Sequence, residues 1–250
     1  MKTSNMILVG ILLGIFAVIL IPFLFWSSNA TFSGKEKIES SGDWERKSYS
    51  LTDFDDIDVR YAYDVVLKQG DFSVDVEAES SVMEKLDIKI VDGTLLLSKD
   101  RNFSFRGTKT PKVYISMPDI ENIHISGSGK FETESTFEAD DIEIFVSGAT
   151  DMDLDLDCTT LKTSISGAGD INLSGEADYY STSNNGAGSI DAKDFVTESV
   201  RVSINGAGSA SVHATQQLDV TINGAGSVTY AGNPETVNKS INGFGSVKPR

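Results

Sequence analysis

A glycine motif that returns every 18 to 21 residues limits the second half of this chain to a small set of folds. Each copy contains Ser or Asn, then Gly, then a variable residue, then Gly or Thr. The first glycines of the seven copies are Gly127, Gly148, Gly167, Gly186, Gly206, Gly224 and Gly243. A unit this short cannot bury a core alone, so neighbouring units must stack and cover one another.

Apolar and polar residues alternate on both sides of each motif. Ile144 and Val146 precede the second copy, and Met152 and Leu154 follow it. A period of two indicates a strand on each side, with one buried face. Because the same turn returns at the same phase, equivalent strands should stack in parallel. The chain is therefore predicted to be all-β, with a parallel β-helix of about seven coils over residues 119–250. Right-handed winding is expected, as in nearly all parallel crossovers.

The seven first glycines are assigned a structural role in the turns. Glycine lets a chain bend where a Cβ atom would clash, and it also adopts positive φ without strain. We expect positive φ at interior copies such as Gly206 and Gly224.

The residue before each first glycine forms a second regular series. Its members are Ser126, Ser147, Ser166, Asn185, Asn205, Asn223 and Asn242. Stacked amides about 4.8 Å apart can hydrogen-bond along the stack, which favours a structural ladder over a row that contacts a ligand. Three residues interrupt the apolar pattern, namely Glu121, Asn184 and Lys239. End caps would account for Glu121 and Lys239, whereas the pattern offers no account of Asn184.

The segment before the repeats, residues 51–118, predicts a small antiparallel β-hairpin subdomain. Val65 and Leu67 precede a turn around Gly70, and a second alternating run follows it. Asp92-Gly93 lies between alternating hydrophobic residues, which is the strongest local indication of a hairpin. Residues 31–50 are rich in Ser, Lys and Glu and are predicted to be a linker.

The first thirty residues contain an uncharged run, residues 6–26, that is long enough to cross a bilayer as a helix. Its length favours an uncleaved signal anchor, because the apolar region of a cleaved signal peptide is shorter. Ser28-Asn29-Ala30 resembles a signal-peptide cleavage site, so secretion after cleavage is the alternative. We expect either a single-pass anchor with an exported C-terminal domain or a protein secreted after cleavage near Ala30.

Charge and cysteine content exclude several classes of function. The net charge is −16, from 21 basic and 37 acidic residues, which argues against nucleic acid as a partner. Cys158 is the only cysteine, so neither an intrachain disulfide nor a cysteine-based metal centre can form. The even repeat spacing leaves no room for the long loops of a carbohydrate-active enzyme, so the chain is predicted to be non-catalytic.

Four aspartates, Asp151, Asp153, Asp155 and Asp157, alternate with apolar residues and should share one strand face. Such a row of carboxylates could hold Ca²⁺, which takes six to eight oxygen ligands. A solvent-exposed strand face is the favoured alternative. No other cofactor is expected.

The chain resembles the bacterial head GIN domain family, whose members are described as auto-transporter adhesins. The resemblance covers about residues 50–247. It rests on FDDIDV at 54–59, DVVLKQG at 64–70, the repeated glycine motifs, and YAGNP at 230–234. The chain departs from the family pattern in having Asn for Ser in four repeats and Phe244 inside the last motif. The resemblance implies an envelope protein built on β-helical repeats behind an export signal, and it supplies no catalytic residues.

The expected function is that of a structural or adhesive binding module of the bacterial cell envelope. Its expected partners are the membrane, through residues 6–26, and either a glycan or an envelope or matrix protein. Two alternatives stay open: a carbohydrate-active β-helix enzyme, and an envelope sensor or assembly partner.

Overall fold

The computed structural model describes residues 36–39, 42–106 and 109–250. Lys37–Arg250 form one compact unit. The predicted anchor at 6–26 and the candidate cleavage site near Ala30 lie outside the described residues. Among the described residues, no helix has the length and apolar character needed to cross a membrane.

The described part of the chain consists almost entirely of strands, with one short helix, α2 (Ser80–Met83). The N-terminal strands are β1 (Glu36–Glu39), β2 (Trp44–Tyr49), β3 (Asp56–Val59), β4 (Asp64–Gln69), β5 (Ser73–Glu79), β6 (Leu86–Val91), β7 (Thr94–Lys99), β8 (Phe103–Arg106) and β9 (Lys112–Met117). The later strands are β10 (Asn122–Ile125), β11 (Ser128–Thr133), β12 (Phe137–Val146), β13 (Ala149–Ile165), β14 (Ile171–Asn184), β15 (Ala187–Ile204), β16 (Ala207–Ile222), β17 (Ala225–Ala231), β18 (Thr236–Ile241) and β19 (Phe244–Pro249).

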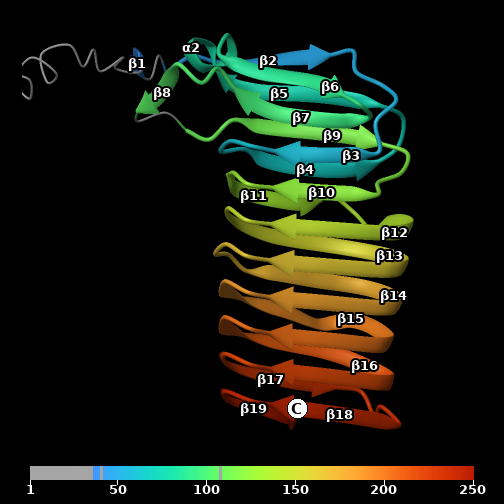
Figure 1. Cartoon of the computed structure of the whole chain (residues 1–250). Coiled ribbons are helices and arrows are strands. Elements are labelled where there is room, and N and C mark those ends of the chain that lie inside the picture. Colours follow the sequence, from blue (N-terminus) through green and yellow to red (C-terminus); the bar gives the residue numbers. More distant parts are fainter. Residues whose placement is uncertain (1–35, 40–41, 107–108) are drawn as a thin grey trace, which may run out of the picture. The chain divides into compact units, whose positions relative to one another are not determined.

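From β10 onward the strands wind into a parallel β-solenoid of about seven turns (Figure 1). Each coil stacks on the previous one in register, so that Met152 lies opposite Ile171 and Leu161 opposite Tyr180. The glycine motifs close one edge, here called the turn edge. At the other edge, called the bend edge, β13 to β16 bend without ending. The predicted parallel stack is confirmed, and its right-handed winding stays a prediction.

Steric contact between coils explains the first glycine of each motif. A Cβ atom on Gly148 would lie 1.8 Å from the carbonyl oxygen of Gly127, and one on Gly206 would lie 2.1 Å from that of Gly186. None of the seven first glycines has a positive φ, so that expectation is wrong. Glycine is required there because the backbone of the preceding coil occupies the space of a side chain.

The predicted amide ladder runs along the turn edge. The Nδ2 group of Asn205 donates to Oδ1 of Asn185 at 2.9 Å, and Asn223 donates in the same way to Asn205 at 2.8 Å. Asn242 continues the series to Asn223 at 3.1 Å. The predicted hydrogen-bonded ladder is confirmed for the four asparagines of this row.

Asn184 closes its own turn from inside the core. It is 1% exposed and lies between Ile165 and Ile204 on the neighbouring coils. Its Oδ1 accepts a hydrogen bond from the amide of Gly186, and its Nδ2 donates to the carbonyl oxygen of Gly188, both at 3.0 Å. The backbone of the turn therefore uses both ends of the buried amide.

The two predicted end caps have different outcomes. Lys239 is exposed in the last coil, where its Nζ donates to the carbonyl oxygen of Val247 at 3.3 Å. Its charge lies at a core position of an edge strand, an arrangement that discourages edge-to-edge association. The prediction for Glu121 is wrong, because the following strand β10 pairs with β3 on one side and β12 on the other.

An additional coil precedes the first glycine motif. Strands β3 and β4 stack in parallel on β10 and β11, with Ile57 opposite Ile123 and Val65 opposite Phe131. Tyr61 occupies the turn position that Gly127 occupies in the next coil. On the far side of this coil, β3 pairs with β7 and β4 pairs with β9, and residues 100–111 separate β7 and β9 in the sequence.

The prediction of a separate antiparallel subdomain at 51–118 is therefore only partly correct. The hairpin at Asp92-Gly93 is confirmed by the antiparallel pairing of β6 with β7. The hairpin around Gly70 is wrong: β9 lies between β4 and β5, parallel to the first and antiparallel to the second. One hydrophobic core continues from this segment into the repeats.

Part of the predicted linker at 31–50 is also structured. Strand β2 pairs antiparallel with β5, and β1 pairs with β8 in a separate two-stranded sheet. Most side chains of β2 are exposed, so its sequence shows no buried alternation that could indicate a strand.

Replacing turn glycines should separate interior coils from the last one. Gly206→Ala should lower the free energy of unfolding by about 3 kcal/mol or more, because backbone on both sides prevents relaxation. Gly243→Ala meets the same obstacle, with the Gly224 carbonyl oxygen at 2.0 Å, but the last coil can move outward, so the loss should be smaller. Chemical denaturation measures both, and the exposed change Ala207→Ser is the control. Equal, negligible losses at both glycines would contradict the steric account.

Two asparagines one position apart in the repeat should respond differently. Asn184→Ala should cost about 2 kcal/mol or more, because it leaves a buried amide and a carbonyl group without partners. Asn205→Ala removes only exposed ladder contacts and should cost about 1 kcal/mol or less. Denaturant melts test the difference, and a larger loss at Asn205 would show that the exposed ladder is the stronger element.

Candidate functional site

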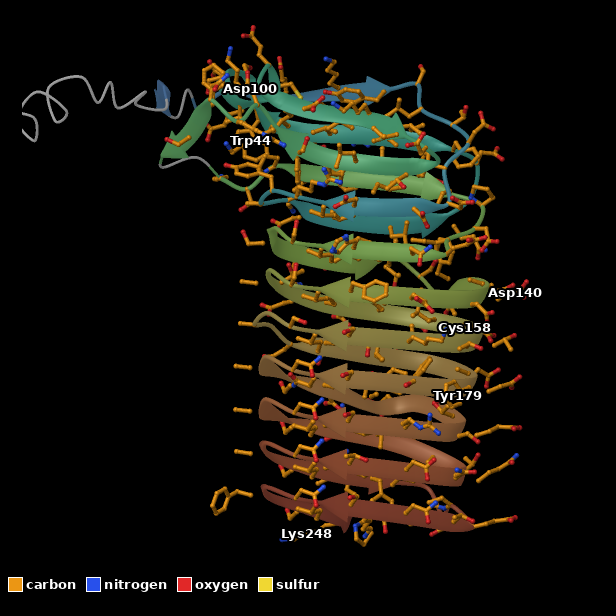
Figure 2. All side chains as sticks on the ribbon, viewed as in Figure 1. Trp44, Asp100, Asp140, Cys158, Tyr179 and Lys248 are labelled. Atoms are coloured by element: carbon orange, nitrogen blue, oxygen red, sulfur yellow. The ribbon has the colours of Figure 1, made fainter. Side chains whose placement is uncertain are left out.

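The bend edge carries a groove lined by carboxylates, here called the acidic groove. Its main pocket has a volume of about 550 Å³. An adjoining pocket of about 230 Å³ continues it along the stack. Its acidic residues are Asp119, Glu138, Asp140, Asp157, Glu176, Asp178 and Glu198. Figure 2 shows Asp140, Cys158 and Tyr179 at this edge, on successive coils.

Strand register places three of these carboxylates in one column. Glu138 lies opposite Asp157, and Asp157 lies opposite Glu176. Neighbouring strands are about 4.8 Å apart, so the like charges repel one another. Within the described chain, no ion pair joins any of the three to a basic residue. The column is therefore a source of uncompensated negative potential along the groove.

Gln69 fixes the N-terminal end of the groove. Its Nε2 donates to the carbonyl oxygens of Pro118 and Glu138 at 3.1 and 2.8 Å. Its Oε1 accepts from the amide of Glu138 at 3.1 Å. One side chain at the end of β4 thus holds the start of β12, so that the first carboxylate of the column has a defined position.

Cys158 lines the groove, but its side chain is mostly buried. The residue is 7% exposed. Burial, followed by the negative charges of Asp157, Asp141 and Asp178, raises the pKa of its thiol to about 12. Because the thiolate is the reactive form, this cysteine is not a nucleophile at neutral pH.

The four predicted aspartates lie on the outer face of β13, as expected from the alternation. Only Asp157 reaches the groove. Asp151 accepts a hydrogen bond from the Asp170 amide at 3.3 Å, and Asp155 accepts one from Thr136 Oγ1 at 3.1 Å. Among the residues that the structure describes, no group of three or more His, Cys, Asp or Glu side chains could hold a metal ion. Calcium binding stays a prediction.

Sequence analysis did not identify Glu138, Glu176, Asp178 or Glu198 as members of one site. The indication was present in their spacing, because Glu138, Asp157 and Glu176 are each 19 residues apart. In a stack with a repeat of that length, equal phase means equal position.

Comparison with known proteins gives the family. The model of the family described as "Putative auto-transporter adhesin, head GIN domain" matches residues 53–234. The chain belongs to the head GIN domain family. A search of curated proteins found no match to this head GIN protein.

Solved structures share the fold of this head GIN protein. A protein described as a putative adhesin from Bacteroides fragilis is 26% identical, with a TM-score of 0.81 over 85% of this chain and 100% of that one. One described as a putative lipid binding protein from Parabacteroides distasonis is 25% identical, with a TM-score of 0.69 over 86% and 100%. A putative adhesin from Parabacteroides merdae is 22% identical, with a TM-score of 0.65 over 86% and 99%, and shows the fold alone. The family points to a protein of the cell surface or envelope.

Removing one charge from the carboxylate column should stabilise the fold. Asp157→Asn should raise the free energy of unfolding by a few tenths of a kcal/mol, up to about 1, because Glu138 and Glu176 no longer face a like charge. Denaturant melts at low and at about 0.5 M NaCl test this, and salt should shrink the gain. Asp151→Asn is the matched control, since Asp151 lies opposite Lys130. A gain at Asp151 equal to that at Asp157 would refute repulsion within the column.

Proposed function

We propose that this head GIN protein is a non-catalytic adhesive module displayed on the bacterial envelope, which attaches through the acidic groove to a positively charged region of an envelope or matrix protein. In this proposal residues 6–26 anchor the module to the membrane, or direct its secretion if the chain is cleaved near Ala30. Membership in a family of auto-transporter adhesins supports the adhesive role.

The carboxylate column is the observation that carries the choice of surface. Residues 116–247 contain 20 acidic and 5 basic residues, so negative charge is concentrated in the solenoid. Elsewhere on the solenoid several carboxylates have partners, as Glu143 has Lys162 and Asp191 has Lys193. In the groove, Glu138, Asp157 and Glu176 repel one another without compensation from the described residues. A basic partner would remove that repulsion and would be attracted over long range.

The regularity of the coils supports the non-catalytic assignment. Successive glycine turns are 18 to 21 residues apart, so no coil contains a long inserted loop. Binding and catalytic residues are disproportionately found on loops that a rigid scaffold positions. Here the strands themselves present the functional groups, in rows that favour contact with an extended partner surface over the enclosure of a small substrate.

An array of matrix proteins and glycans, probed with the purified full chain, tests this function. We expect retention on at least one basic matrix protein, weakened roughly tenfold by the triple change Glu138→Gln, Asp157→Asn and Glu176→Gln. The control triple, Asp71→Asn, Glu84→Gln and Asp92→Asn, removes equal charge from exposed positions outside the groove and should bind like the parent. No retention on any matrix protein, or equal losses with both triples, would refute the acidic groove as the adhesive surface.

A further inference from the structure

A pocket on the outer face of β3, β10 and β12 shares no residue with the acidic groove. It is here called the Phe145 pocket, and Asp56, Asp58, Asn122, His124 and Phe145 contribute to its lining. Its volume is about 440 Å³. Sites for small molecules typically have volumes of roughly 300–1,000 Å³.

Phe145 departs from the row in which it lies. In the later coils, the equivalent outward positions hold only small hydroxyl residues: Ser164, Ser183, Ser203, Thr221 and Ser240. Phe145 is 43% exposed, and its ring meets that of His124 edge to face, with centroids 6.3 Å apart. An aromatic ring kept partly in solvent on a face of serines contributes little to the core, and it offers a flat apolar surface to a ligand.

Asp58 provides a second, independent observation. It lies beside His124 in the strand register and is 7% exposed. The guanidinium group of Arg60 makes both of its contacts with one carboxylate oxygen, Oδ2, at 2.6 and 2.8 Å. The other oxygen, Oδ1, is buried and has no hydrogen-bond partner among the residues that the structure describes. A buried acceptor without a donor destabilises the fold. Asp58 lines the pocket, so a bound ligand could supply the missing donor.

The missing partner of Asp58 is a hydrogen-bond donor and not a charge. Arg60 already compensates the negative charge of the carboxylate. A neutral hydroxyl group satisfies an acceptor of this kind without adding a second cation beside the guanidinium. Nearby, Asn122 donates to Oδ1 of Asp56 at 2.7 Å, which fixes the orientation of a second carboxylate in the pocket.

We propose that the Phe145 pocket binds a neutral hexopyranose ring, with Phe145 under its C–H face and Asp58 accepting a hydrogen bond from one of its hydroxyl groups. A sugar ring combines an apolar face with hydroxyl donors at its rim, and this pocket pairs an exposed aromatic ring with carboxylates. The site is separate from the acidic groove and does not depend on it.

Saturation-transfer NMR on the full chain tests the proposal. The probes are the methyl glycosides of glucose, galactose, mannose and N-acetylglucosamine, each at millimolar concentration. We expect at least one to bind, with at least a roughly tenfold loss of affinity in Phe145→Ala and retention in Phe145→Tyr. Asp58→Asn should also weaken binding. Circular dichroism and thermal melts of each variant establish that the fold is intact.

Phe244→Ala is the matched control. Phe244 is 87% exposed in the last coil, so its loss removes an aromatic ring outside the pocket and should leave sugar binding unchanged. Failure of all four glycosides to bind, or equal binding by the parent and Phe145→Ala, would overturn the proposal. Neither result affects the matrix-protein assay, which depends on Glu138, Asp157 and Glu176.

Discussion

Every coil after the first depends on one contact, in which a glycine Cα lies against the carbonyl oxygen of the preceding turn. The hydrogen in place of the Cβ points at that oxygen, as in the Cα–H···O contacts between adjacent strands. The contact sets the spacing of the turns to that of hydrogen-bonded strands. The amide of Ala207 can therefore donate to the Gly186 carbonyl group at 3.0 Å, and the asparagine amides come within hydrogen-bond distance of one another.

Fixed spacing has a consequence for the outer surface. Because each residue lies directly above the one that is one repeat earlier, a single residue type repeated at one phase becomes a line of identical groups. Along the turn edge this produces an amide ladder, which stabilises the stack through successive hydrogen bonds. Along the bend edge the same geometry aligns Glu138, Asp157 and Glu176, and the result is repulsion. Stacking aligns a repulsive row as readily as a stabilising one. Because a repulsive row does not stabilise the stack, its presence points to a role in function.

The same geometry explains which parts of the fold could be predicted from the sequence. Residues 119–250 could be assigned because each coil repeats the constraint of the one before, and the glycines mark it at a constant phase. The coil formed by β3 and β4 was missed because it has Tyr61, and not a glycine, at the position that Gly127 occupies in the next coil. The order β4–β9–β5 could not be predicted, since the strand between the two local partners begins 33 residues after the end of β5. Among the residues of the acidic groove, only Asp157 was predicted as a site residue from the sequence. Alternation shows which face of a strand a residue occupies, but it does not show where along that face a groove forms.

In this fold, a residue that departs from its row indicates more about function than a residue that repeats the row. Inside the solenoid, Asn184 departs from a column of isoleucine and valine residues, and the backbone of its own turn uses both ends of its amide. That departure is explained by structure alone. On the outside, Phe145 departs from a row of serines, and no core contact accounts for an aromatic ring left 43% exposed. In the same pocket, Asp58 retains a buried oxygen that has no donor among the described residues. An unexplained apolar group and an unexplained acceptor in one pocket are better accounted for by a single ligand than by two independent defects of packing.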